Sequence, residues 1–195
     1  MKRKTIFIFT WCFLIVTAVY SQKVISNLGF ELLDAKGGVI SWYTSHSAHY
    51  EIKLDTSVSY TGKCSLLLEY RTDTDTISDN RFAFGNSFIG SSIIKSKRLV
   101  NISAYIKSQN FAAGYAGIGV RLESKQGTIL FETNSYEQNP ISTTDWTRVS
   151  VELPLTPDVK SIIYGFATTG TGKIWFDDFE ILLDGEPVGD MLDVN

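Results

Sequence analysis

The segment at residues 172–181 constrains the fold more than any other part of the chain. It reads GKIWFDDFEI, so aromatic and β-branched residues that favour strands lie beside acidic side chains. Residues 27–31, NLGFE, have the same character near the other end of the chain. An acid among apolar residues is costly unless it is paired or coordinated. We therefore expect one closed β-domain whose first and last strands meet, with the acids paired or holding a metal ion.

The rest of the chain has the pattern of short strands and almost none of the periodicity of helices. Apolar residues alternate or form short runs between clusters of Gly, Asn, Asp, Ser and Thr. We predict strands near residues 25–33, 48–54, 64–71, 80–89, 97–108, 115–123, 127–133, 146–153, 160–168 and 173–183. About ten strands without a helical insert indicate an all-β jelly-roll β-sandwich.

The N-terminus has the features of a secretory signal peptide. Lys2, Arg3 and Lys4 precede an apolar run at 5–20, which is short for a membrane span. We predict cleavage after Ser21; the alternative is an uncleaved anchor. The predicted organisation is a signal peptide at 1–21, a β-sandwich at 22–186 and a tail at 187–195, in a secreted or periplasmic, monomeric protein.

Charge and cysteine content narrow the possible partners. The chain has a formal net charge of −3, and the predicted signal peptide removes three basic residues and no acidic one. The resulting acidic domain argues against nucleic acid, and against a membrane after signal cleavage. Cys64 is the one cysteine beyond the signal, so no intrachain disulfide can form, and we expect a buried structural thiol.

The sequence gives little support for catalysis. His46 and His49 are three residues apart in a Ser-rich segment, without an evident third metal ligand nearby. No Gly-x-Ser-x-Gly elbow is present. Asp177 and Asp178 are adjacent on a predicted strand and should point to opposite faces, so they cannot act as a glycosidase pair. We predict that the protein is not an enzyme.

Several pieces in a fixed order carry a family resemblance. Between NLGFE and GKIWFDDFEI lie YTGKCSL at 60–66, AYIK at 104–107, GYAGIGVR at 114–121 and TDW at 144–146. Together they resemble the galactose-binding-like carbohydrate-binding modules of the type 4/9/22 group. The set is most similar to the N-terminal domain ahead of secreted Bacteroidetes-type hydrolases, such as C-terminal-processing serine peptidases or erythromycin-esterase-like proteins.

The resemblance implies a secreted, non-catalytic module that binds carbohydrate. The alternative is an accessory or interaction domain of a hydrolase whose catalytic domain is absent from this chain, with no sugar binding. The resemblance also implies a structural calcium ion held by Glu31, the backbone of Lys63, and Asp178. The alternative is that Lys63 or Arg side chains neutralise these acids and no metal binds.

The predicted ligand site depends on which residues share a strand face. In 101–107 the apolar residues alternate with Tyr105 and Lys107, and in 116–123 they alternate with glycines and Arg121. An aromatic ring and a guanidinium beside flat sheet suit a sugar. We place Tyr105, Arg121, Trp42, Tyr43 and Asn134 in one cleft, although Tyr105 and Arg121 could instead be a cross-strand pair on a solvated face. Trp146 and Trp175 are predicted core residues.

Overall fold

A computed structural model describes residues 22–25, 27–71, 82–136, 145–188 and 191–194, with side chains placed within 27–71, 82–136 and 145–188. The predicted signal peptide at 1–21 lies outside these described residues. Within the described ranges, no helix is long and apolar enough to cross a membrane.

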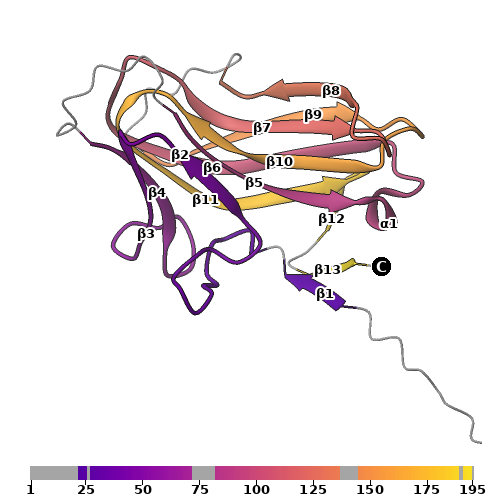
Figure 1. Ribbon diagram of the computed structural model, residues 1–195, viewed down its shortest axis with the longest axis horizontal. Coiled ribbons are helices and arrows are strands. Elements are labelled where there is room, and N and C mark those ends of the chain that lie inside the picture. The colour runs from indigo at the N-terminus through magenta and orange to yellow at the C-terminus, as the bar shows by residue number, and fades with distance from the viewer. Residues whose placement is uncertain (1–21, 26, 72–81, 137–144, 189–190, 195) are drawn as a thin grey trace, which may run out of the picture.

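Two antiparallel sheets face each other and form a β-sandwich (Figure 1). The five-stranded sheet has the order β2 (Tyr43–His46), β5 (Ala83–Gly90), β10 (Ser161–Thr168), β7 (Ala116–Glu123), β8 (Ile129–Asn134). The six-stranded sheet runs β3 (Tyr50–Asp55), β4 (Ser65–Tyr70), β11 (Thr171–Leu183), β6 (Leu99–Ala112), β9 (Thr147–Pro154), with β12 (Glu186–Pro187) paired to β11. One short helix, α1 (Ser91–Ile94), follows β5. The all-β jelly-roll prediction is confirmed.

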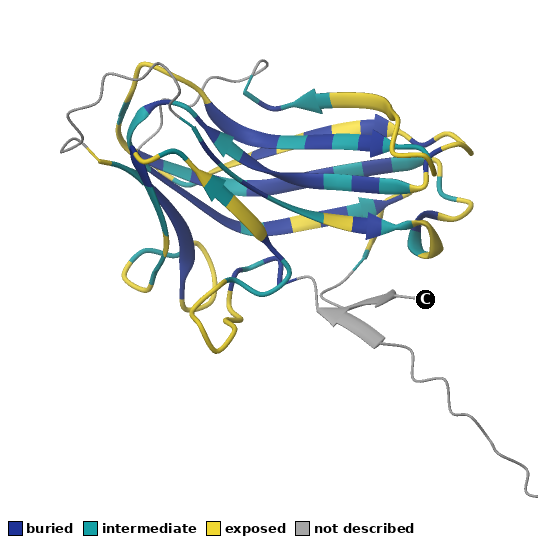
Figure 2. Cartoon of the chain, in the orientation of Figure 1, coloured by how far each residue is buried: buried dark blue, intermediate teal, exposed yellow. Residues whose placement is uncertain are grey.

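The hydrophobic core fills the space between the sheets, and strands such as β6 and β9 alternate buried with more exposed residues (Figure 2). An aromatic cluster lies at its centre. The ring of Trp42 lies 5.0 Å from those of Phe30 and Phe179 and 5.5 Å from that of Phe166. Such rings bury large apolar areas and gain further from their tilted contacts. This cluster joins the N-terminal segment to β10 and β11.

Residues 27–32 form a turn, so the strand predicted over 25–33 is wrong. Asn27 and Phe30 adopt positive φ angles of 47° and 58°, and the Phe30 N–H donates to the Asn27 carbonyl. The Asn27 side chain donates to the carbonyls of Leu32 and Ile40 and accepts from the Leu32 N–H. The expected meeting of the chain ends is nevertheless present, because the Phe179 N–H in β11 donates to the Leu28 carbonyl at 3.1 Å.

The predicted tail at 187–195 contains further strand structure. β13 (Met191–Val194) pairs antiparallel with β1 (Gln22–Ile25) as a separate two-stranded ribbon. Both segments carry β-branched or aliphatic residues that suit a strand, and the acidic character of the tail does not prevent the pairing.

Candidate functional site

A groove of about 600 Å³ lies on the outer face of the five-stranded sheet. Residues that are paired across antiparallel strands point to the same face, so the register defines its floor. One row runs across the sheet through Tyr43, Asn86, Gly165, Gly119 and Asn134. Because its two central members are glycines, β10 and β7 expose bare backbone between polar and aromatic neighbours.

The next rows give the groove its walls and ends. On one side of the glycines lie Phe84 of β5 and Ala167 of β10, and on the other lie Ile163, Arg121 and Glu132. Tyr136, which follows β8 in the chain, lines the groove close to Gly117 of β7, and its ring stacks on that of Tyr115 at 4.3 Å. At the opposite edge, Tyr43 is 64% exposed on strand β2. Phe84 and Tyr136 therefore supply aromatic rings to the lining of the groove, and Tyr43 continues its floor row onto β2.

The two floor glycines differ in the space around them. A Cβ atom on Gly165 would overlap the carbonyl oxygen of Gly85 and lie 2.9 Å from the Asn86 Cα. On Gly119 it would meet only the Thr133 carbonyl oxygen, at 3.7 Å. Gly165 is therefore required for the packing of β5 against β10, whereas Gly119 keeps the groove open without being needed for the fold.

Arg121 supplies the positive charge in this groove. Its Nε lies 2.9 Å from Glu123 Oε1, two residues along the same face of β7. This ion pair holds the stem of the side chain along the strand. Glu132 of β8 lies directly across from Arg121 in the register. The groove thus offers a guanidinium, a carboxylate and two amides, from Asn86 and Asn134, beside aromatic rings.

Two of the five predicted ligand residues, Arg121 and Asn134, line this groove, a third lies next to it on the same sheet face, and two lie elsewhere. Tyr43, Arg121 and Asn134 share the outer face of the five-stranded sheet. Trp42 is buried in the core, where its indole N–H donates to the Asn27 carbonyl at 3.0 Å, so it cannot form a wall. Tyr105 lies on β6 in the other sheet. The proposed shared cleft of Tyr105 and Arg121 is therefore wrong.

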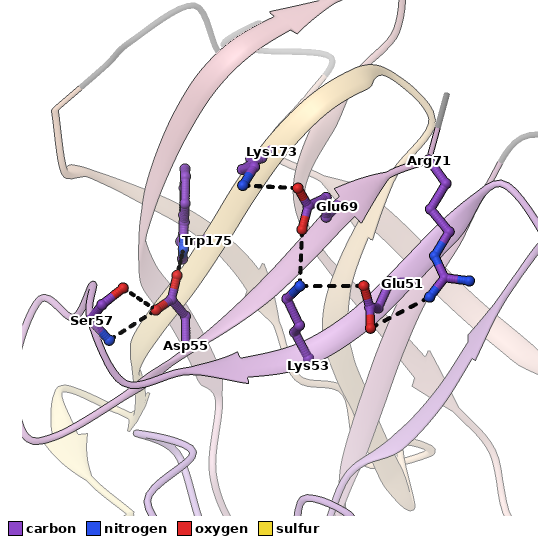
Figure 3. A network of polar contacts seen from close by, with 8 residues as sticks. All are labelled: Glu51, Lys53, Asp55, Ser57, Glu69, Arg71, Lys173 and Trp175. Carbon is purple, nitrogen blue, oxygen red and sulfur yellow. Dashed lines mark hydrogen bonds and ion pairs between the residues drawn. The ribbon is translucent and has the colours of Figure 1, made fainter. Parts of the chain in front are cut away.

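Tyr105 belongs to an aromatic group on the outer face of the six-stranded sheet. Its ring stacks on that of Tyr60 at 3.5 Å, and the half-buried Trp146 lies 5.9 Å from Tyr60. Trp175 is buried as predicted but also on this outer face, where its indole N–H donates to Asp55 Oδ2 at 2.9 Å (Figure 3). These residues cover the outside of the sheet. The prediction that Trp146 and Trp175 belong to the core between the sheets is therefore wrong, although Trp175 is buried.

The acids at the two ends of the domain both bind the turn at 60–64. Glu31 Oε1 accepts from the backbone N–H groups of Lys63 at 2.8 Å and Cys64 at 3.3 Å. Asp177 Oδ2 accepts from those of Tyr60 at 2.7 Å and Thr61 at 3.2 Å. Cys64 is buried, as predicted, and burial raises the pKa of its thiol.

Asp177, rather than Asp178, is the fully buried acid of β11. Asp178 has a positive φ of 51° at an irregularity in the pairing of β11 with β6, so the strict alternation expected for two adjacent strand residues is broken there. Burial raises the pKa of Asp177 to about 6, although three backbone N–H groups donate to its carboxylate.

Backbone N–H groups occupy one oxygen of Glu31, an acid predicted to bind calcium. The backbone N–H groups of Lys63 and Cys64 donate to Glu31 Oε1, so Lys63 turns a hydrogen-bond donor toward that carboxylate. Calcium requires six to eight oxygen ligands. Among the described residues, no group of three or more His, Cys, Asp or Glu side chains could hold a metal ion. A calcium ion between Glu31 and Asp178 stays a prediction.

Comparison with known proteins gives matches at the level of structure. No protein-family model and no curated protein matches the chain. The CBM22-1 xylan-binding domain of Paenibacillus barcinonensis Xyn10C matches with a TM-score of 0.51 at 16% identity, over 80% of this chain and 92% of that domain. TmCBM61, solved with β-1,4-galactotriose, matches with a TM-score of 0.52 at 13% identity, over 84% and 99%. The chain therefore shares the β-sandwich fold of these two domains.

A similar fold also occurs within a longer protein. The enzymatically active domain of tailspike protein 4 from bacteriophage CBA120 matches with a TM-score of 0.60 at 12% identity. The match covers 83% of this chain and 21% of the tailspike chain, so this chain spans about a fifth of the tailspike chain that it matches. At these identities, the similarity establishes the fold alone.

Sequence reasoning expected glycine-lined sheet at Gly119, but it missed other residues that shape the groove, among them Phe84, Asn86, Glu132, Tyr136 and Gly165. The pattern around Gly165, YGFA within an otherwise β-branched strand, was the available signal, because glycine inside a strand often marks close backbone approach. Without the order of the strands, no sequence feature placed Gly165 opposite Gly119.

Proposed function

We propose that this protein is a non-catalytic carbohydrate-binding module that holds a segment of polysaccharide in the groove across β5, β10, β7 and β8. The observation that carries the proposal is the glycine floor at Gly119 and Gly165 between aromatic rings and amides. A pyranose ring carries C–H groups on its faces and hydroxyls at its edges, so one face can lie against a flat surface. Bare backbone admits such a ring closely, rings contact its faces, and planar polar groups bind its hydroxyls.

The carboxylates of the groove support a binding role in preference to hydrolysis. Glycosidases use two carboxyl groups that flank the scissile bond. Glu132 is the one acid among the described residues that line the groove. Arg121 has its Nε paired with Glu123, outside this lining. A single carboxylate can accept hydrogen bonds from hydroxyls, but it leaves the second catalytic role unfilled.

Soluble polysaccharides in a native affinity gel test the proposal. The structural neighbours bind xylan and β-1,4-galactotriose, so the panel should include xylan and β-1,4-galactan beside other neutral polymers. We expect one or more to retard the domain. Replacing Gly119 with Val places a side chain on the floor and should abolish that retardation. A domain that migrates unchanged with every polymer would overturn the proposal.

An accessory role in a hydrolase is the second candidate, and strand β8 favours it. Ile129, Leu130 and Phe131 are consecutive, 42–50% exposed, and lie on an edge strand. An exposed apolar edge is suited to contact with another protein domain. Association with a hydrolase encoded beside this chain, abolished by Phe131→Lys and without glycan binding, would support this role over the first.

The site of action follows from the predicted signal peptide. We propose that the module works in the secreted or periplasmic compartment, where polysaccharides are accessible, and that it does so as a monomer or as part of a hydrolase. Detection of a mature chain that begins at Gln22 in the culture medium or periplasm, by N-terminal sequencing, tests this proposal. A full-length chain retained in the membrane fraction would contradict it.

A further inference from the structure

The short helix α1 lies at one end of the sandwich (Figure 1). A second hollow, of about 780 Å³, is lined in part by this helix. It is lined by α1 and the segment after it, the turn between β7 and β8, and the connection between β9 and β10. It shares no described lining residue with the glycine-floored groove. Ile94, Leu155 and Val159 are buried beneath it and give it an aliphatic floor.

Five cationic side chains surround this floor: Lys95, Lys97, Arg98, Lys125 and Lys160. We call this hollow the basic basin. Its charge is unusual for this chain, whose net charge is −3. Lys160 Nζ donates to the Pro157 carbonyl at 2.7 Å, within the basin wall. The nearby Asp184 carboxylate accepts from the backbone N–H groups of Arg98 and Leu99, at 3.0 Å each, so it orders the wall.

Several cations elsewhere on the domain form ion pairs with acids of the same chain. On the outside of the six-stranded sheet, Glu69 lies 3.0 Å from Lys53 and 2.8 Å from Lys173, and Glu51 contacts both Lys53 and Arg71 (Figure 3). Among the described residues, no ion pair involves any of the five basin cations. Like charges gathered in one place repel one another, and an anionic ligand would reduce this repulsion.

We propose that the basic basin binds an acidic glycan, a sugar chain that carries carboxylate or sulfate groups. The lysines and Arg98 would bind the anionic groups, while the aliphatic floor would contact the C–H groups of the sugar rings. Hydroxyl groups at the rim, such as those of Ser96 and Thr156, suit a hydroxyl-rich ligand.

Other polyanions fit the basin less well. Insertion into a membrane uses exposed large apolar side chains, and none of those described lies in the basin lining. Single-stranded nucleic acids are bound by stacking on aromatic rings, and the described lining contains none. The basin is also a hollow, so it can enclose part of a sugar chain.

Binding of polygalacturonate and heparin to the whole domain tests the proposal, with neutral dextran and poly-glutamate as controls. Titrations at low and high salt should show binding to an acidic glycan that weakens with salt, because screening reduces exposed charge interactions. Lys95→Gln with Lys125→Gln should weaken it by about tenfold or more, equivalent to about 1.4 kcal/mol. Lys36→Gln with Lys107→Gln, which changes the net charge equally, should leave it unchanged.

The outcomes separate the basin from the groove and from rival ligands. Gly119→Val should not alter binding of the acidic glycan, so failure in one hollow is distinguishable from failure in the other. No binding to either acidic glycan at low salt, or equal weakening by both lysine pairs, would overturn the proposal. Equal affinity for poly-glutamate would overturn the sugar assignment. Binding to phosphatidylglycerol vesicles in place of glycans would make the basin a membrane contact.

Discussion

Gly119 and Gly165 lie directly opposite each other on β7 and β10, yet only Gly165 lacks room for a side chain. Gly165→Ala should destabilise the domain, because its methyl group would overlap the Gly85 carbonyl and force β5 away from β10. We expect a loss on the order of 1–3 kcal/mol, as for other overpacked sites. Gly119→Ala should unfold at the same urea concentration as the wild type. Equal destabilisation by both changes would contradict the packing described for β10.

The face of each strand could be predicted from the sequence, but its sheet could not. Alternation correctly placed Tyr105 and Arg121 opposite the apolar residues of their own strands. The two strands, however, belong to different sheets, because β6 pairs with β11 and β7 pairs with β10. Strand order arises from contacts between residues far apart in the chain, and one sequence's alternation carries no information about it.

Local irregularities were also beyond the sequence pattern. The turn at Asn27 is held by hydrogen bonds to Leu32 and Ile40, and these depend on the folded position of residue 40. The positive φ at Asp178 shifts the faces of β11 and makes Asp177 the buried acid. By contrast, the close contact of residues 27–31 with β11 could be expected. In both segments an acid lies beside apolar residues, and such an acid needs a binding partner when it is buried.

Two buried tyrosines offer a matched pair for testing the core. The Tyr50 hydroxyl donates to the Gly170 carbonyl. The buried Tyr164 hydroxyl faces Ser87 but forms no hydrogen bond with any described residue. Tyr50→Phe should lower the free energy of unfolding by about 1–2 kcal/mol, because it leaves a carbonyl without its donor. Tyr164→Phe should leave stability unchanged or slightly raised. Chemical denaturation of the two variants measures the difference, and a greater loss for Tyr164→Phe would refute this interpretation.

The buried carboxyl of Asp177 should make stability depend on pH. Burial raises the pKa of Asp177 from 3.8 to about 6 in the folded state. The native state therefore binds the proton more tightly than the unfolded chain, and this group's contribution to stability increases as the pH falls from above 6 to below 4. Relative to Asp177→Asn, the wild type should gain up to about 3 kcal/mol between pH 7 and pH 4.

Unfolding free energies of both proteins across this range check the Asp177 prediction. The difference between them isolates the group from other carboxyls, which titrate in both proteins. A difference that declines on acidification would mean that the N–H donors of Tyr60, Thr61 and Asp178 outweigh burial and depress the pKa.

Glu31 should stabilise the turn at 60–64 with or without a metal. Glu31→Ala removes the acceptor for the Lys63 and Cys64 N–H groups, and we expect a loss of about 1–2 kcal/mol. The calcium prediction is tested on the wild type by melting metal-loaded protein with and without excess chelator. A melting temperature several degrees lower with chelator supports a bound ion. An unchanged melt of protein known to be metal-loaded counts against one.

Calorimetric titration with the neutral polysaccharide that retards the domain tests the central proposal most directly. Gly119→Val should abolish measurable binding, and Tyr43→Ala should weaken it by about 1–2 kcal/mol through loss of one ring beside the groove. Tyr105→Ala, on the other sheet, should bind as the wild type does once its folding has been verified. Normal binding by Gly119→Val together with loss of binding by Tyr105→Ala would contradict the assignment and place the ligand on the six-stranded sheet.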